Sequence, residues 1–240
     1  MTTDDDDEHA QPAEVVSEYG PFPGVDRVHG VTYDGARVWF ATNAQLHALD
    51  PVTGTLVGAL PIACDAGTAF DGTYLFQITK RQIHKIDPRT GAVVSSIPAP
   101  GHGDDAGLTW ADGALWVGQF RSRKIYKIDP ETGAILKTIE SNRFVTGVTW
   151  VDGELWHGAA EAGTAEAGTS EAGTSEAGTA EAGTSELRHV DPDTGAVITR
   201  LALAPGVFAS GLESDGRDRL FCADGPKGTV LAIRRPRRKR

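Results

Sequence analysis

The chain consists of short apolar segments, four or five residues long, that alternate with turn signals. The pattern is clearest in residues 107–139. There residues 107–110 and 114–118 flank an Asp-Gly pair, and residues 125–128 and 135–139 flank Asp-Pro-Glu-Thr-Gly. Asp-Gly favours a tight hairpin because both central residues of a type I′ turn need positive φ. The pattern therefore predicts four short antiparallel strands.

This unit recurs along the chain. Asp-Pro-x-Thr-Gly stands at residues 50–54, 87–91, 129–133 and 191–195, each time after an apolar segment. First strands are predicted to start at five glycines: Gly30, Gly67, Gly107, Gly147 and Gly211. Repeats of roughly 40 residues indicate a stacked or radial architecture. Four short strands per repeat are typical of a propeller blade. We predict an all-β, five-bladed β-propeller with four-stranded antiparallel blades.

The fifth unit lacks an outer strand, because the segment at residues 229–233 is followed by Arg-Arg-Pro. The N-terminal segment at residues 14–19 resembles the outer strand at residues 93–97. We predict that this N-terminal strand completes the last blade and closes the ring, which leaves no sheet edge open between the first and last units. An open, non-closing array is the alternative.

Large aromatic residues recur at matching positions. In the second strands they are Trp39, Phe76, Trp116, Trp156 and Phe221, and in the first strands Tyr33, Phe70, Trp110 and Trp150. Radially packed sheets leave a wedge between neighbours, and we expect these rings to fill it. Stacking against a ligand is the alternative.

The sequence predicts one propeller domain, at residues 14–233 of the 240, with a net charge of −10 for the whole chain. We expect the acidic residues 1–13 to be disordered and residues 234–240 to form a basic tail. A Glu-Ala-Gly-Thr-(Ala/Ser) repeat at residues 160–186 has no β-branched apolar or aromatic residue to build a core, so we expect a flexible, low-complexity loop inserted in blade four.

No run of ~20 apolar residues is present, so no membrane span is expected. The acidic start differs from a secretory signal. We therefore predict a soluble, cytoplasmic monomer. Nucleic acid is an expected partner only of the basic tail. Cys64 and Cys222 are predicted to be reduced, because two cysteines in different blades make no disulfide framework.

A binding site is expected on one face of the disc. The links from second to third strands share this face with the links from each outer strand to the next first strand, and these links are rich in polar residues. The candidate ligand-binding residues are Asp65, Asp105, Gln77, Gln119 and Arg121. The candidate general acid/base residues are His29 and His157. The alternative is that polar residues merely line a water-filled channel.

A divalent metal ion is the candidate cofactor. The residues predicted to meet at the channel mouth as metal ligands are His29, Cys64, Asp104 and Asp105. Imidazole, thiolate and carboxylate together suit a transition metal, whereas oxygen ligands alone suit calcium or magnesium.

The run Gly-Leu-Thr-Trp-x-Asp-Gly-x-Leu-Trp-Val, followed by Lys-Ile-Tyr-Lys-Ile-Asp-Pro-Glu-Thr-Gly, resembles a broad propeller superfamily. It includes the glutamine cyclotransferases, the virginiamycin B lyase-like proteins and the quinoprotein-like YVTN repeats. The resemblance covers about residues 14–233 and implies the blade, not a chemistry. The cyclotransferases are expected to carry Phe-Thr-Gln-Gly-Leu where this chain has Arg-Val-His-Gly-Val at residues 27–31, and their following Glu-Ser is missing. The lyase-like proteins imply a metal-positioned His/Glu pair, and no matching motif is present.

Two functional hypotheses follow. The first is a non-catalytic propeller that binds a small molecule, a metal ion or a protein on its channel face. The second is an enzyme of the cyclotransferase, lyase or lactonase type that uses His29 or His157 with a carboxylate-bound cation at the same site.

Overall fold

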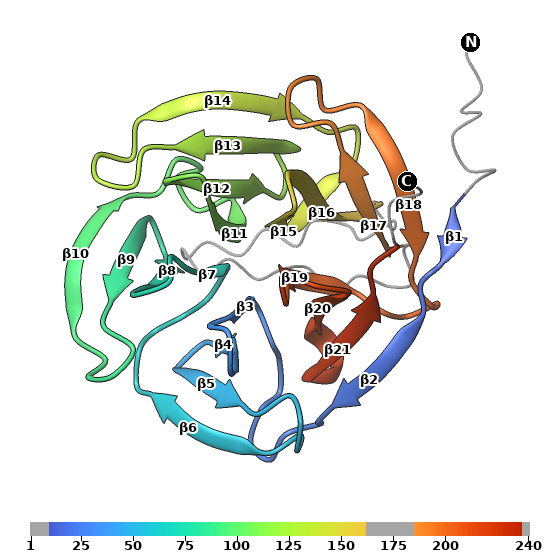
Figure 1. Ribbon diagram of the computed structural model, residues 1–240. Helices are drawn as coiled ribbons and strands as arrows, with labels where there is room; N and C mark the ends of the chain where they lie inside the picture. Colours follow the sequence, from blue (N-terminus) through green and yellow to red (C-terminus); the bar gives the residue numbers. More distant parts are fainter. Residues whose placement is uncertain (1–9, 162–184, 237–240) are drawn as a thin grey trace, which may run out of the picture.

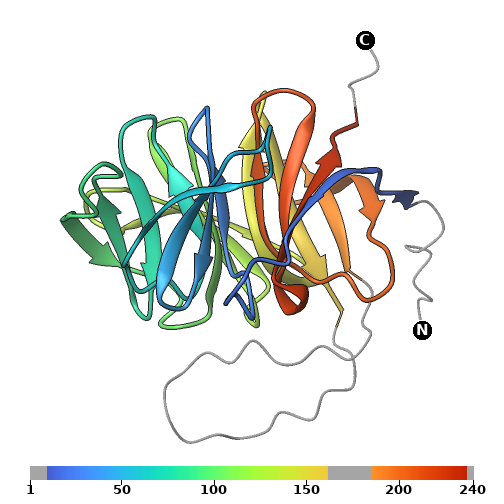
Figure 2. The same ribbon diagram turned by 90° about the horizontal axis from the view of Figure 1, so that it is seen from below.

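Five four-stranded antiparallel sheets surround a common axis in the computed structural model, which describes residues 10–161 and 185–236 (Figure 1). The view in Figure 2 shows the resulting disc from its edge. The predicted all-β, five-bladed propeller is confirmed. In these two ranges the one helix is a 3-10 turn, Gly225–Lys227, and no helix is long and apolar enough to cross a membrane.

In blades one to four the strands follow one another from the axis to the rim in chain order, whereas the outer strand of blade five is the N-terminal strand β2. Blade one contains β3 (Val31–Tyr33), β4 (Val38–Thr42), β5 (Gln45–Leu49) and β6 (Leu56–Leu60). Blade two contains β7 (Thr68–Phe70), β8 (Leu75–Thr79), β9 (Gln82–Ile86) and β10 (Val93–Pro98). Blade three contains β11 (Asp105–Ala111), β12 (Ala114–Gln119), β13 (Lys124–Ile128) and β14 (Ile135–Glu140). Blade four contains β15 (Phe144–Val151), β16 (Glu154–Ala160), β17 (Ser185–Val190) and β18 (Val197–Ala202). Blade five contains β19 (Ala209–Ser214), β20 (Arg219–Asp224), β21 (Thr229–Arg234) and β2 (Val15–Tyr19).

The repeated Asp-Pro-x-Thr-Gly phrase builds the turn between third and outer strands. In blade three the Asp129 carboxylate accepts hydrogen bonds from the backbone N–H groups of Glu131 (3.0 Å) and Thr132 (2.8 Å). The N–H of Gly133, at φ +75°, donates to the carbonyl of Asp129 at 2.9 Å. Hydrogen bonds from the Thr132 side chain and from these amides lower the pKa of Asp129. The aspartate and glycine are thus explained by the turn itself.

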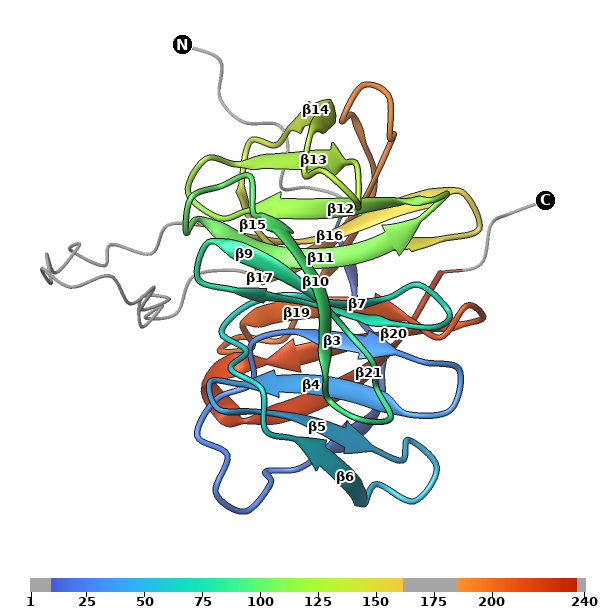
Figure 3. The same cartoon turned by 90° about the vertical axis from the view of Figure 1, so that its left-hand side faces the viewer.

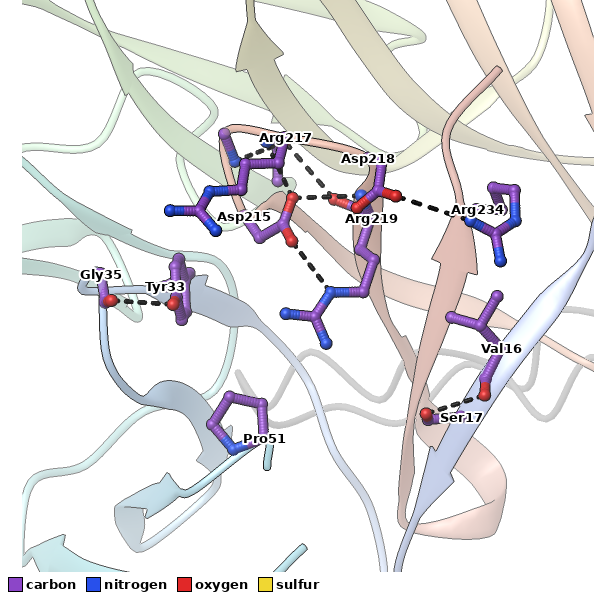
Figure 4. A network of polar contacts seen from close by, with 12 residues as sticks. Val16, Ser17, Tyr33, Gly35, Pro51, Asp215, Arg217, Asp218, Arg219 and Arg234 are labelled. Carbon is purple, nitrogen blue, oxygen red and sulfur yellow. Dashed lines mark hydrogen bonds and ion pairs between the residues drawn. The ribbon is translucent and has the colours of Figure 1, made fainter. Parts of the chain in front are cut away.

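The N-terminal strand closes the ring, as predicted. β2 pairs antiparallel with β21 as the outer strand of blade five, and Figure 1 shows the two side by side. The hydroxyl of buried Tyr19 donates to the carbonyl of Pro51 in blade one at 2.9 Å. On the same side of the molecule, Arg219 bonds Asp215, and Arg234 pairs with Asp218 (Figure 4).

The short strand β1 (Gln11–Pro12) adds to blade four. It runs parallel to β18, with Gln11 opposite Leu201. Disorder was expected through residue 13, whereas Gln11 and Pro12 form this strand. The physical reason is that the outer edge of β18 offers unpaired backbone groups to a passing chain. The rest of the predicted acidic terminus (residues 1–9), most of the predicted insertion (162–184) and the end of the basic tail (237–240) lie outside the described residues.

The seams between blades are filled by the predicted aromatic residues. Phe76 of blade two stacks on Trp110 of blade three, with ring centroids 5.5 Å apart. Trp116 stacks on Trp150 of blade four at 5.3 Å. All five second-strand rings are buried. Phe76 and Trp116 therefore each bridge two blades, which is the packing that a wedge-shaped gap requires.

The axis is lined by the five glycines that begin the inner strands, here called the glycine ring: Gly30, Gly67, Gly107, Gly147 and Gly211. A Cβ atom added at any of them would lie 2.4–2.8 Å from the backbone of the next blade. Because real Cβ contacts are not that short, only glycine lets the blades approach this closely. The glycine ring therefore fixes how tightly the disc closes.

Candidate functional site

The links from second to third strands and from each outer strand to the next first strand lie on one face, here called the loop face. The Asp-Gly and Asp-Pro-x-Thr-Gly turns lie on the opposite face, here called the turn face. This follows from the antiparallel order of the strands. Figure 3 shows the disc from its edge, with the strands running between the two faces. The residues that precede the glycine ring, His29 and Thr146 among them, lie on the loop-face side of the axis.

Cys64 does not reach the channel mouth, which corrects its predicted place among the metal ligands. It is buried in the seam of blades one and two, against Trp39 and Leu46. Its thiol donates to the carbonyl of Gln45 at 2.9 Å, and burial raises its pKa to about 12. Within the part of the chain that the structure describes, no three His, Cys, Asp or Glu side chains gather as metal ligands.

Asp104 and Asp65 cap loop-face turns. The Asp104 carboxylate accepts the backbone N–H groups of Arg121 (2.9 Å) and Ser122 (2.8 Å). Asp65 accepts the N–H of Lys80 at 3.2 Å, in a turn where Lys80 has a φ of +57°. Their carboxylates are therefore occupied by the backbone. The Arg121 side chain lies exposed beside the first of these turns.

Gln77 is a fully buried joint between the first two strands of blade two. Its carbonyl accepts the hydroxyl of Thr68 at 2.6 Å, and its amide donates to the carbonyls of Ile78 (2.8 Å) and Ala66 (3.1 Å). All of its donors and its acceptor have partners within its own blade. This explains the residue by packing alone.

Asp105 and Gln119 form a buried pair at the loop-face end of blade three. The Gln119 amide and the backbone N–H of Gly101 both donate to Oδ1 of Asp105, at 2.7 and 2.9 Å. Oδ2 of Asp105 and Oε1 of Gln119 are buried and have no hydrogen-bond partner. Burial raises the pKa of Asp105. Two neighbouring residues thus each keep an unused acceptor, which suits a hydrogen-bond donor.

The two candidate histidines differ. Nε2 of His29 is buried and has no partner, and burial together with the charge of Arg27 lowers its pKa, so the imidazole is neutral near pH 7. His157 is fully buried, its Nδ1 donates to the carbonyl of Gly158 at 3.0 Å, and burial lowers its pKa to about 4. Because His157 has no contact with solvent, it is a poor general base for a substrate at the loop face.

Buried polar atoms without partners gather on the loop face. Eight buried side-chain atoms without a hydrogen bond occur in the described residues, and one of them, Oδ2 of Asp224, forms an ion pair with Nζ of Lys227 at 3.1 Å. Five of the other seven belong to residues at the loop-face ends of strands or in the links between blades: His29, Asp105, Gln119, Thr146 and Thr229. Because each unsatisfied buried group costs about 1–3 kcal/mol, the gathering marks this face as the place where a ligand or water would be gained.

Glu213 was not among the predicted residues. It lies on the inner strand of blade five, two residues after Gly211, and points to the axis on the turn-face side of the glycine ring. Its carboxylate accepts the hydroxyls of Thr149 (2.5 Å) and Thr32 (3.0 Å). Burial raises its pKa to about 7. The sequence could have indicated this residue by alignment: two residues after the glycine, blades one, three and four have threonine, whereas blade five has Glu213.

Comparison with solved structures finds chains of similar fold. Glutaminyl cyclase of Myxococcus xanthus superposes with a TM-score of 0.68 at 13% sequence identity, over 94% of this chain and 97% of that chain. Hydrazine synthase of Kuenenia stuttgartiensis has a TM-score of 0.49 at 14% identity, over 85% of this chain and 59% of that chain. At these identities the likeness concerns the fold alone. The search of curated proteins found no match.

The sequence also matches a family of propeller repeats. The family described as outer membrane protein assembly factor BamB matches residues 26–203, which is most of the chain and spans blades one to four. Together with the fold, this match confirms the predicted quinoprotein-like propeller superfamily. The chain therefore belongs to the family of the outer membrane protein assembly factor BamB.

Proposed function

We propose that the protein is a non-catalytic binding propeller that holds a small polar ligand on the loop face, with Asp105 and Gln119 as its principal contacts. The observation that carries the proposal is the pair of buried, unpartnered acceptors, Oδ2 of Asp105 and Oε1 of Gln119. Acceptors of this kind favour a ligand that donates hydrogen bonds, such as an amine, an amide or a hydroxyl compound.

The loop at residues 100–104 covers the Asp105–Gln119 pair. Residues 100–104 connect β10 to β11, and Gly101 lies against the amide of Gln119, where a Cβ atom would collide with Oε1. Gly103, at φ +108°, has open space around it. Because Asp105 and Gln119 are buried beneath this loop, a ligand would reach the two acceptors only if the backbone at Gly101 shifted. His29 and Thr146, which also carry unpartnered atoms, are further contacts nearer the axis.

The family assignment agrees with a binding role, since its description names an assembly factor rather than an enzyme. Among the described residues, the thiols of Cys64 and Cys222 are buried with raised pKa values, and His157 is enclosed. These groups are poor nucleophiles and bases where they lie.

The test begins with mass spectrometry of small molecules that co-purify with the full chain. A library of amines, amides and polyols is then screened by thermal shift. We expect Asp105→Asn to abolish the stabilisation by any hit, while Asp112→Asn, which keeps an Asx-Gly turn on the opposite face, preserves it. Hits whose stabilisation survives Asp105→Asn and Gln119→Leu would refute this site.

An enzyme is the second candidate, and the observation that favours it is His29. Its neutral imidazole with an unpartnered Nε2 is suited to accept a proton from a substrate. The direct assay is pyroglutamate formation from a peptide with N-terminal glutamine. Turnover that is lost in His29→Ala, with the fold intact by circular dichroism, would establish this candidate; absence of turnover with this peptide would remove the cyclotransferase branch.

A further inference from the structure

Blade four differs from the others in the row of residues that faces blade three. In each blade, one residue of the second strand lies opposite a residue of the third strand, which in turn lies opposite a residue of the outer strand. These three cross-strand neighbours form a row. In blade four the row is His157, Arg188 and Arg200. The rows of the other blades are Phe40, His47, Ala59; Gln77, His84, Ser96; Val117, Tyr126, Thr138; and Cys222, Leu231, Glu18. Blade four alone places two arginines directly opposite each other, which costs free energy unless the charge is compensated.

These arginines are buried. The side chain of Arg188 is fully covered and that of Arg200 is 9% exposed. A single partly buried carboxylate, that of Glu186, serves both: it accepts a hydrogen bond from Nε of Arg188 at 2.5 Å and lies 3.9 Å from Nε of Arg200. A third guanidinium, Arg143, pairs with Glu161, whose side chain is 42% exposed. Among the described residues, the two buried guanidiniums of Arg188 and Arg200 thus share the single carboxylate of Glu186.

Arg188 also keeps a donor without a partner. Its Nη1 donates to the side-chain carbonyl of Asn142 at 2.5 Å, whereas its Nη2 is buried and bonds nothing. Burial and the nearby charges of Arg200 and Arg143 lower its pKa. The N–H donors of a guanidinium lie in one plane in a fork-like arrangement, so an anion with two oxygens can accept two parallel hydrogen bonds from it.

The fork lies one side chain below the surface. Asn142, in the link from β14 to β15, is exposed on the loop face and at the same time contacts Arg188. Movement of this one amide would therefore open Arg188 to a solute. An oxyanion that replaces the Asn142 oxygen would gain the idle Nη2 donor and would offset the charge of Arg200.

We propose that the seam of blades three and four binds a small oxyanion, a phosphate or a carboxylate, through Arg188 beneath Asn142, with Arg143 and Arg200 supplying further positive charge. The site is separate from the Asp105–Gln119 pair and does not rest on the function proposed above. Phosphate and carboxylate share the two-oxygen geometry that the guanidinium fork recognises.

The experiment is calorimetric titration of the full chain with inorganic phosphate and, separately, with acetate, at an ionic strength held constant with sodium chloride. We expect saturable binding, tighter for phosphate if the natural ligand is a phosphate compound and tighter for acetate if it is a carboxylic acid. Asn142→Asp places a carboxylate beside the fork, so it should weaken binding at least about tenfold while raising the melting temperature.

Arg188→Gln removes the fork and should also abolish binding. If this variant fails to fold, Asn142→Asp decides the question alone. Arg217→Gln, which removes an exposed arginine from the turn face, should bind like the wild type. Absence of saturable binding by either anion, or affinity that is unchanged in Asn142→Asp, overturns the proposal.

Discussion

Thr149, on the inner strand of blade four, donates a 2.5 Å hydrogen bond to the carboxylate of Glu213, on the inner strand of blade five. The same carboxylate accepts the hydroxyl of Thr32 in blade one at 3.0 Å, and a hydrogen bond from Thr109 in blade three acts on its pKa. One side chain at the axis therefore ties four of the five blades together. Because the group is buried, its protonation state must affect the stability of the whole ring.

Glu213→Gln should remove a pH dependence of stability. Burial raises the pKa of Glu213 from its ordinary value of 4.5 to about 7. Because the pKa of Glu213 is higher in the folded than in the unfolded state, its protonated form contributes fully to the free energy of unfolding below about pH 4.5. This contribution is lost as the pH rises through 7. The wild type should therefore lose about 3 kcal/mol of unfolding free energy from this group between pH 4.5 and 8. Urea denaturation at several pH values measures the loss, which the glutamine variant should lack.

The matched control is Glu18→Gln, because Glu18 is an exposed glutamate on β2 of the same blade. It should keep the wild-type slope between pH 4.5 and 8. If Glu213→Gln and Glu18→Gln have the same slope as the wild type, the axial carboxylate does not titrate in this range and its assigned role is wrong.

The fold was predictable because its determinants are local and repeated. The turn built on Asp129 depends on residues within four positions of it, and the same holds for its three counterparts. The N-terminal strand was recognisable by its likeness to other outer strands, since a closed ring needs a twentieth strand. Each turn or strand pattern is a weak prediction by itself, but its recurrence in five units made the prediction of the blade reliable.

The candidate site was less predictable, because it depends on which side chains use up their hydrogen bonds. Asp65, Asp104 and Asp105 look alike in the sequence, yet the first two cap turns and only Asp105 keeps an unpartnered oxygen. Cys64 was predicted at the channel mouth from its alignment alone, whereas its side chain, in the link from β6 to β7, packs into a seam with Trp39 and Leu46. Glu213 was missed because its partners lie in blades one, three and four, up to 181 residues away in the chain.

Removing the Tyr19 side chain should weaken ring closure. Tyr19 is 7% exposed, packs with residues of blades one and five, and bonds the carbonyl of Pro51. Tyr19→Phe should lose about 1 kcal/mol of unfolding free energy for the hydrogen bond, and Tyr19→Ala about 3–5 kcal/mol because a cavity is added. Urea denaturation measures both. The control is Tyr33→Phe, whose hydroxyl makes only an exposed bond to Gly35 (Figure 4) and should cost less. Equal losses in the two phenylalanine variants would contradict the bridging role of Tyr19.

Gly107→Ala should destabilise the disc strongly. The new Cβ would lie 2.6 Å from the backbone nitrogen of Val148, so blades three and four must move apart. We expect a loss of about 1–3 kcal/mol, as for overpacked cores. Gly58→Ala is the control, because nothing lies within 4 Å of its Cβ and its φ is not positive; it should be neutral or slightly stabilising. Thermal unfolding compares the two. A Gly107→Ala melting temperature equal to that of Gly58→Ala would show that the glycine ring is not close-packed.

The two cysteines should be inert in the native protein. Cys64 and Cys222 are both buried, and burial raises the pKa of each thiol, to about 12 for Cys64. Because the thiolate is the reactive form, a chromogenic disulfide reagent at pH 8 should label neither residue until denaturant is added, and should then label both. Ser122→Cys introduces an exposed thiol on the loop face and should react at once, which shows that the reagent is active. Rapid labelling of Cys64 in the native wild type would show that its thiol is accessible at the loop face, and Cys64 would again be a candidate metal ligand.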